Sequence, residues 1–303
     1  MTITLPALAA LRDVFGACLL LDEPLAKHTS ARIGGPADAF LVAETSADLE
    51  QAARAAWAHD LPLFILGGGS NILISDTGVR GLVVHNQADA VHFDGQTVRA
   101  GSGLSTIHMA RRAAQRGLAG LEWAIGIPGT LGGAVYGNAG AHGGDMAGIV
   151  TRVQAITPDG PLELTGEQMV YQYRSSILKR ERRRCVVLSA ELRLTPADPA
   201  AIKARMKEYT DYRKRTQPPG ATIGSMFKNP PGDYAGRLIE AAGLKGQRLG
   251  GAEISAVHAN FFLNAGDACA ADVKALADLA IREVEARFGK RLELEIELVG
   301  EWR

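Results

Sequence analysis

The sequence predicts an α+β protein of two domains, or of three small ones, on the basis of three observations. The chain has 303 residues, and single hydrophobic cores stop growing at about 250–300 residues. Short apolar runs alternate with helical patterns in the first part of the chain, whereas the middle is mainly extended. An amphipathic helix and an alternating segment close the chain, which is typical of a compact α+β domain.

A βαβ-like unit is the first group of elements that the sequence predicts. Residues 40–43 are typical of a strand, Ser46 caps a helix that extends to about His59, and residues 63–66 form a second strand. Two further strands are predicted at residues 79–84 and 97–100, and a helix at residues 105–116. Gly117 follows this helix, at a position where a residue with a positive φ commonly ends a helix.

The chain changes character at a proline-containing stretch. Residues 152–194 are mainly extended, with a turn at Asp159-Gly160. Residues 195–199 are predicted to be a linker. The helix that follows carries one apolar stripe, formed by Ile202, Met206, Tyr209 and Tyr212.

A helix and a strand are predicted at the end of the chain. The helix covers residues 271–288 and ends at Gly289. Residues 292–298 then alternate between Leu or Ile and Glu, which predicts a strand with one apolar and one charged face. The inner face of the helix is formed by Val273, Leu276, Ala280, Val284 and Phe288.

Composition excludes several classes of protein. The chain has 33 Lys and Arg against 33 Asp and Glu, whereas nucleic-acid and anionic-lipid binders need a cationic excess. No apolar run approaches the ~18 residues of a membrane span, and no basic leader precedes the apolar N-terminal stretch. Cys18, Cys185 and Cys269 are far apart and indicate buried thiols of a reducing compartment. The seven histidines lack metal-ligand spacing, so we expect no catalytic metal, and we expect a cytoplasmic monomer.

Two glycine clusters are candidates for holding an anion or a flat ring. Residues 67–71 read Gly-Gly-Gly-Ser-Asn directly after a strand, and the absence of Cβ atoms lets successive N–H groups converge. Residues 126–141 carry glycines that leave one side of a short helix bare. Close packing of two backbone segments selects glycine equally well. Neither a Rossmann fingerprint nor a P-loop is present, but two cradles together favour a dinucleotide cofactor.

At this point the motifs resemble a known family, the UDP-N-acetylenolpyruvoylglucosamine reductases, which are flavin enzymes of peptidoglycan precursor synthesis. The similarity is specific because the matching motifs occur in family order over almost the whole chain. These motifs lie at residues 29–38, 67–71, 126–141, 173–176, 224–230, 258–261 and 295–300.

The resemblance implies a fold, a cofactor and a hydride donor. The fold is an FAD-binding fold of the vanillyl-alcohol-oxidase type in two α/β subdomains, at residues 1–80 and 81–198, followed by a substrate-binding α+β domain at 199–303. NADPH is the implied reductant of FAD. The implied FAD contacts are Arg32, Gly67, Gly68, Gly69, Ser70, Asn71, Gly129, Thr130, Gly132, Gly133, Ala134, Gly140 and Ala141.

The chain departs from the family pattern at a few positions. About 70 residues separate Ser225 from Glu295, which resembles the compact subgroup without an inserted substrate loop. His142 stands where the family usually has an aromatic residue, and Thr222-Ile223 replaces a Ser-Ala pair. Glu297 occupies a position where a basic residue is common, which weakens the case for a cationic substrate contact there.

The resemblance also assigns the catalytic residues of an enolpyruvyl reduction. Arg174 stabilises charge beside the substrate carboxylate, Ser225 donates a proton, and Glu295 orients the donor or bonds the enol. All three are expected to meet over the isoalloxazine ring. The implied substrate contacts are Tyr173, Lys228, Asn229, Gln247, His258 and Asn260.

Each assignment has a structural alternative. Arg174 precedes a charge run at 179–184 that is typical of a solvated face, and Ser225 is equally suited to capping a turn. Glu295 is one of three carboxylates on the polar face of the predicted strand. Two other functions remain open: a flavin oxidase or dehydrogenase of a small alcohol, sugar or hydroxy acid, and a flavin- or nucleotide-sugar-binding regulator without catalysis.

Overall fold

The computed structural model describes residues 3–302, and their contacts divide the chain into two compact units. Unit 1 comprises the residues up to Leu20, residues 40–68 and residues 81–213. Unit 2 comprises residues 21–39, residues 69–80 and the residues from Lys214 onward. This grouping joins two N-terminal segments to the C-terminal part of the chain, whereas the sequence predicts three consecutive domains, a division that stays a prediction.

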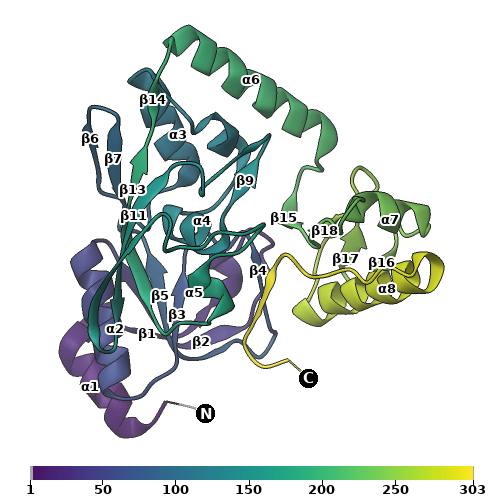
Figure 1. Ribbon diagram of the computed structural model, residues 1–303. Coiled ribbons are helices and arrows are strands. Elements are labelled where there is room, and N and C mark those ends of the chain that lie inside the picture. The colour runs from purple at the N-terminus through teal and green to yellow at the C-terminus, as the bar shows by residue number, and fades with distance from the viewer. Residues whose placement is uncertain (1–2, 303) are drawn as a thin grey trace. The chain divides into compact units, whose positions relative to one another are not determined.

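A four-stranded sheet of order β1-β2-β5-β3 is formed by the first part of the chain (Figure 1). β3 pairs in parallel with β5, and α2 connects β2 to β3, so the predicted βαβ-like unit is confirmed with β5 inserted in the sheet. Thr45 caps α2, in place of the predicted Ser46, because its hydroxyl accepts from Asp48 N while the Asp48 carboxylate accepts from Thr45 N. The elements are α1 (Leu5–Phe15), β1 (Leu20–Pro24), β2 (Pro36–Ala43), α2 (Ser46–Ala58), β3 (Leu63–Leu66) and β5 (Val79–Asn86).

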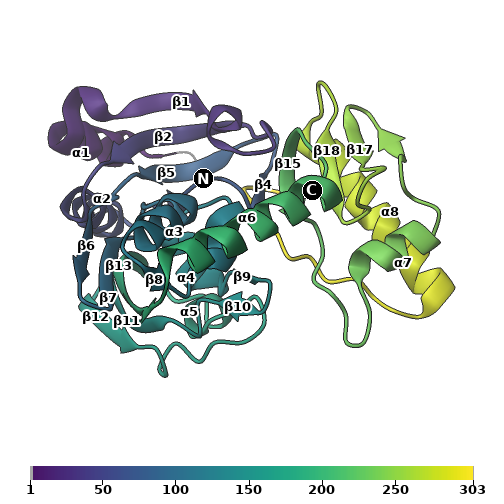
Figure 2. The same ribbon diagram turned by 90° about the horizontal axis from the view of Figure 1, so that it is seen from above.

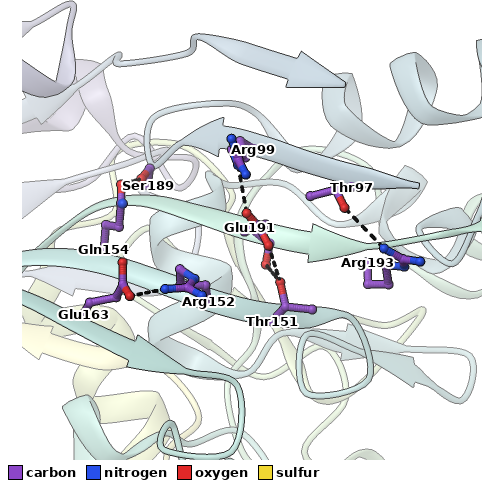
Figure 3. Close-up of polar contacts among 9 residues, drawn as sticks. All are labelled: Thr97, Arg99, Thr151, Arg152, Gln154, Glu163, Ser189, Glu191 and Arg193. Carbon is purple, nitrogen blue, oxygen red and sulfur yellow. Dashed lines mark hydrogen bonds and ion pairs between the residues drawn. The ribbon is translucent and has the colours of Figure 1, made fainter. Parts of the chain in front are cut away.

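An antiparallel five-stranded sheet of order β12-β11-β13-β7-β6 organises the rest of unit 1. Figure 3 shows its polar face, where Arg99 on β7 binds Glu191 on β13 at 2.8 Å and Arg152 on β11 pairs with Glu163 on β12. Alternate residues of the same strands, such as Val98 and Leu192, are buried in the core. The strands are β6 (Val91–Asp94), β7 (Thr97–Gly101), β11 (Val150–Thr157), β12 (Gly160–Thr165) and β13 (Val186–Arg193).

Helices and short strands complete unit 1. Ser105 caps α3, and Gly117 follows the helix with φ +66°, where the sequence predicts the helix to end. Residues 195–196 form β14, which pairs with β8, so the predicted linker is part of the fold. The helix after it carries buried Ile202 and Met206, but Tyr212 at its far end is half exposed. These elements are α3 (Thr106–Gln115), β8 (Leu118–Ala119), α4 (Leu131–Gly137), β9 (Gly140–Ala141), β10 (Gly144–Asp145), α5 (Ile177–Arg180), β14 (Thr195–Pro196) and α6 (Pro199–Thr216).

Unit 2 combines an antiparallel sheet of order β15-β18-β17-β16 with two helices. The helix α8 packs on β16 and β17, and α7 packs on α8 (Figure 2). A second, parallel pair joins β4 to β19. The elements are β4 (Ile72–Ile74), β15 (Ala221–Ser225), α7 (Ala235–Ala241), β16 (Arg248–Leu249), β17 (Ala252–Ile254), β18 (Phe261–Asn264), α8 (Ala270–Phe288) and β19 (Glu297–Val299).

Three predictions are corrected by the structure. The predicted strand at residues 292–298 is not continuous: β19 pairs with β4, whereas Leu294 makes an isolated antiparallel bridge to Phe227. Leu292 and Ile296 are nevertheless buried. Phe288, at the last turn of α8, is 37% exposed and does not belong to the helix's buried face. Cys18 is exposed, although its type favours burial.

Residues 3–302 contain neither a membrane-spanning helix nor a metal-binding cluster. Within this range, no helix combines the length and the apolar character that crossing a membrane requires. Within the same range, no group of three or more His, Cys, Asp or Glu side chains is arranged to hold a metal ion.

Candidate flavin and catalytic site

The two predicted glycine cradles touch one another in unit 1. A Cβ atom at Gly67 would lie 2.5 Å from the Thr130 hydroxyl, and one at Gly68 would lie 3.0 Å from Gly129 Cα. Gly129 itself has φ +124°, which only glycine adopts without strain. Glycine at these positions is therefore required by backbone packing, which brings the two loops into a single cradle.

The helix α4 follows this contact, and Gly133 in its first turn is open on its Cβ side. Gly132 faces the backbone and Cβ of Ser102, and its N–H donates to Ser102 O at 2.7 Å. A Cβ at Gly133, in contrast, would meet only the Thr130 hydroxyl, at 3.9 Å. A bare helix face beside a glycine-lined loop fits a flat, phosphate-bearing group such as a flavin dinucleotide. Gly133 and Thr130 are the residues of unit 1 that fit this contact best.

Gly140 and Ala141, two other predicted FAD contacts, lie in the short hairpin β9–β10. They pair with Asp145 and Gly144, and a Cβ at Gly140 would lie 2.5 Å from Asp145 Cβ. The hairpin turn contains His142, with φ +53°. The His142 ring stacks on Tyr209 with 4.0 Å between centroids and an interplanar angle of 4°. The departure from the family pattern at position 142 therefore retains a flat ring in a stacked arrangement.

Arg174 lies at the tip of a tight turn in unit 1. Gln172 and Ser175 exchange two backbone hydrogen bonds, of 2.9 and 3.0 Å, so Tyr173 and Arg174 form the tip. Arg174 has φ +55°, in the left-handed region that is uncommon for a residue with a long side chain. Its guanidinium carbon lies 5.4 Å from the centre of the Tyr173 ring, and Tyr173 is 55% exposed.

Tyr171, a partly buried residue whose hydroxyl is fully buried, lies immediately before this turn. The Tyr171 hydroxyl has no hydrogen-bond partner within the described part of the chain. Burial raises the pKa of Tyr171, and the negative charge of Asp145 adds to that effect. The hydroxyl therefore stays protonated and keeps its capacity to donate.

Ala134, a further predicted FAD contact, lies in α4 in unit 1, and the others, Arg32, Gly69, Ser70 and Asn71, lie in unit 2. Ser30 N donates to Gly69 O at 3.0 Å, and a Cβ at Gly69 would lie 2.3 Å from His28 O. The triple-glycine loop is thus packed against the segment that carries Arg32, whose φ is +57°.

Ser225 and Glu295 are brought together in unit 2, although 70 positions separate them in the sequence. Ser225 ends β15, and the carbonyl of the next residue, Met226, accepts from Glu295 N at 2.9 Å. Phe227 and Leu294 form an antiparallel bridge beside this bond. The predicted proton donor and the predicted carboxylate therefore sit on adjacent backbone segments.

The end of the triple-glycine loop reaches the same place. The Asn71 side chain donates to Glu295 O at 3.2 Å, and Asn71 O accepts from Glu297 N at 3.0 Å. Ser70 O lies 3.9 Å from the position of a Cβ at Gly224, the residue before Ser225. Two predicted FAD residues thus adjoin two predicted catalytic residues, whereas Arg174 belongs to unit 1.

Three of the predicted substrate residues already have partners within unit 2. The Lys228 ammonium binds the Glu293 carboxylate at 2.5 Å, and Lys228 N donates to Glu293 O. Asn229 Oδ1 accepts from the backbone N of Ala235, at the start of α7. Gln247 is exposed and donates to Arg248 O at 3.1 Å. Exchange of these partners for a ligand is easiest for Lys228, because Glu293 is largely exposed to solvent.

The Asn260 side chain binds the main chain of Phe227 in this structure. Its Oδ1 accepts from Phe227 N at 2.9 Å, and its Nδ2 donates to Phe227 O at 2.8 Å. Asn260 is 4% exposed, so both ends of its amide are engaged away from solvent. Asn260 therefore positions the segment after Ser225, and the substrate contact that the resemblance implies stays a prediction.

His258 lies next to Asn260 and accepts from its backbone N–H through Nδ1, at 3.2 Å. A Cβ at Gly236 would lie 2.8 Å from His258 Cε1, so α7 packs directly against the ring. Burial lowers the pKa of His258. The neutral ring is consistent with Nδ1 acting as an acceptor.

Asn138 is a further residue of the second glycine cluster, and the sequence assigns it no role of its own. It ends α4 in the left-handed conformation, with φ 48° and ψ 59°, and its side chain donates to Gln172 O at 3.0 Å. The signal in the sequence is the Gly137-Asn138 pair at the end of the helix, since asparagine tolerates this conformation.

Comparison with known proteins gives the family. A model of the C-terminal domain of UDP-N-acetylenolpyruvoylglucosamine reductase matches residues 216–299, and a model of an FAD binding domain matches residues 37–166. UDP-N-acetylenolpyruvoylglucosamine reductase 2 of Symbiobacterium thermophilum is 48% identical over 284 residues, covering 92% of this chain and 91% of that protein. The corresponding reductase of Bacillus subtilis is 41% identical over 286 residues, covering 93% and 94%.

Solved structures agree with this result. The crystal structure of UDP-N-acetylenolpyruvylglucosamine reductase from Thermus caldophilus has a TM-score of 0.79 at 35% identity, covering 93% of this chain and 98% of that one. A Phl p 4 variant described as a glucose oxidase has a TM-score of 0.50 at 15% identity over 64% of this chain and 44% of that one, which concerns the fold alone. The fold is that of FAD-binding proteins of the vanillyl-alcohol-oxidase type. The chain belongs to the UDP-N-acetylenolpyruvoylglucosamine reductase family of FAD-dependent oxidoreductases.

Proposed function

We propose that this protein reduces the enolpyruvyl group of UDP-N-acetylglucosamine enolpyruvate to give UDP-N-acetylmuramate, with NADPH as hydride donor, in peptidoglycan precursor synthesis. The relatives described above carry the name of this reductase. The single observation that carries the proposal is the backbone bond that joins the segment after Ser225 to Glu295, beside Asn71 of the glycine loop.

FAD, when bound and reduced, supplies the hydride for the terminal carbon of the enolpyruvyl group. The neighbouring carbon then carries negative charge next to a carboxylate. Arg174 is suited to this charge because its planar guanidinium is permanently cationic and binds carboxylates in a bidentate manner. The loss of one such donor costs about 2.7–4 kcal/mol of transition-state stabilisation in comparable sites.

The proton for that carbon comes from the Ser225 hydroxyl in this proposal. A serine hydroxyl is a weak acid, so it needs an orienting partner that stabilises the change in charge. Glu295 is the partner that we propose, since the main chain holds the two residues on neighbouring segments. Tyr173, Lys228, Asn229, Gln247 and His258 are proposed to contact the substrate.

Measuring the two half-reactions separately distinguishes a catalytic role of Ser225 from a structural one. We expect Ser225→Ala to leave the reduction of FAD by NADPH within about twofold of the parent. We expect it to slow reoxidation by the enolpyruvyl substrate by at least about a hundredfold, because only the second step needs the proton. Ser189→Ala, on the polar face of the five-stranded sheet in unit 1, is the matched control and should change neither rate.

Two results would contradict the proposal. Equal slowing of both half-reactions by Ser225→Ala would remove Ser225 as the proton donor. A parent protein that oxidises NADPH without any dependence on the enolpyruvyl substrate would refute the proposed reaction itself.

A further inference from the structure

The turn that carries Arg174 is fastened on both sides to the end of α4. On one side, Asn138 Nδ2 donates to Gln172 O at 3.0 Å. On the other side, the Ser176 hydroxyl donates to Tyr136 O at 2.7 Å. Gln172 and Ser176 flank the tip directly. The two anchoring side chains are 4% and 0% exposed, so water does not compete for these bonds.

Asn138 uses its whole amide group in this arrangement. Its Oδ1 accepts from Ala147 N at 3.0 Å, and its Nδ2 lies 3.4 Å from Asp145 Oδ2 in addition to the bond to Gln172 O. The left-handed backbone at Asn138 directs the side chain out of the helix end, and few residues other than Gly, Asn and Asp adopt this conformation readily. Asparagine alone among these three supplies both an N–H donor and an acceptor.

The same short helix also carries the open cradle position. Gly133 lies one turn before Tyr136 in α4, and Asn138 follows the helix as its C-cap. The open glycine and the two anchoring points therefore belong to one seven-residue helix and its cap. The position of Arg174 is thus tied to the segment that we expect to hold the flavin.

We propose that Asn138 is a positioning residue for Arg174: it clamps the turn 172–175 to α4 and so fixes the guanidinium relative to the flavin cradle. This inference rests on the proposed function of Arg174 in stabilising charge on the substrate. The left-handed φ of Arg174 supports it, since a turn in this conformation persists only where its surroundings hold it.

The clamp is tested first without any chemistry, on the holoenzyme. Asn138→Gly keeps the left-handed helix end but removes the side chain, so the turn should open more often. Trypsin should then cleave the Arg174–Ser175 bond at least about fivefold faster, as measured by mass spectrometry, because proteolysis follows the population of locally open states. Thr45→Ala, which removes the cap of α2, is the control and should leave cleavage at this bond unchanged. An unchanged rate in Asn138→Gly would overturn the clamp.

The consequence for catalysis is tested by a double-mutant cycle with Arg174→Lys. We expect Asn138→Gly to slow reoxidation of FAD by substrate about tenfold and to leave its reduction by NADPH and its absorption spectrum unchanged. The effects of Asn138→Gly and Arg174→Lys should be less than additive, because Asn138 affects catalysis by positioning the Arg174 side chain. Asn138→Asp, which keeps the acceptor for Ala147 N but loses the donors, should resemble Asn138→Gly. Additive effects, or equal slowing of both half-reactions, would refute the positioning role.

The two tests also separate this inference from the proposed function. Faster cleavage in Asn138→Gly together with a substrate-independent parent enzyme would mean that the clamp exists but that the proposed reaction is wrong. A substrate-dependent parent with additive effects would leave the reaction standing and would remove the role of Asn138.

Discussion

The amide of Asn260 gives the most quantitative prediction. It makes two hydrogen bonds to the backbone of one residue, Phe227, at 2.9 and 2.8 Å. Phe227 is fully buried, so no water replaces either bond when the amide is removed. A buried main-chain group left without a partner costs about 1–3 kcal/mol. Asn260→Ala leaves two such groups and should therefore lower the free energy of unfolding by about 2–6 kcal/mol.

Thermal unfolding of the FAD-bound protein measures this effect. The expected decrease in Tm is about 4–24 °C, because 1 kcal/mol corresponds to roughly 2–4 °C in chains of 150–250 residues. Asn229→Ala is the matched control in the same unit, since Asn229 is exposed and makes one side-chain bond, to Ala235 N. It should lower the Tm by less than about 4 °C.

Asn260→Asp tests the chemistry of the pair more sharply. A protonated carboxyl supplies one donor and one acceptor, which is what Phe227 requires, whereas the carboxylate supplies acceptors only. The folded state therefore favours the protonated form and raises the pKa of the new carboxyl above its unfolded value, about 3.9. Its stabilising contribution is present at low pH and is lost as pH rises through the folded pKa. A Tm of Asn260→Ala within 2 °C of the parent would refute the reasoning.

Three further predictions concern the cradle, a helix end and pH. Gly133→Ala should preserve folding and reduce FAD content, whereas Gly137→Ala in the same helix, also facing open space, should retain FAD; equal FAD content in the two variants would contradict the cradle. Asp76→Ala should lower stability by about 1–2 kcal/mol, since its carboxylate accepts from Ala270 N and Ala271 N at the start of α8, and urea unfolding should detect it. The lowered pKa of His258 contributes stability above its unfolded value of about 6.5, and this is lost as pH falls through the folded pKa. His258→Gln should flatten that acid limb in a series of thermal melts, and an identical pH profile would count against burial of the ring.

Local signals in the sequence predicted much of the fold. The helix α3 has its cap at Ser105 and its stop at Gly117 because both act within one turn of the helix. The end of the chain shows the limit of such signals. Alternation correctly marked Leu292 and Ile296 as buried, but a strand also needs a neighbour with unpaired backbone groups. Residues 297–299 find one in β4, more than 200 positions away, whereas Leu294 makes an isolated bridge to Phe227, so the segment changes partner and is not one continuous strand.

The candidate site was predictable by family resemblance more than by physics. No periodicity selects Glu295 from its neighbours, and only the backbone bond to Met226 places it beside Ser225. The glycines illustrate a second limit. Gly68 is required because another backbone lies against it, whereas Gly133 faces open space, and the sequence treats the two alike. The sequence shows that a position accepts glycine, but whether glycine is there for close packing or for an open surface depends on contacts with distant segments.

The way unit 2 holds its predicted catalytic pair has a consequence for the chemistry. Main-chain hydrogen bonds, together with the amides of Asn71 and Asn260, fix the segments that carry Ser225 and Glu295. The two segments are therefore held in place through the main chain and these amides. Replacing Ser225 should change proton transfer far more than stability, whereas replacing Asn260 should change stability first. A proton donor as weak as serine depends on fixed geometry, and this network of main-chain and amide hydrogen bonds provides it.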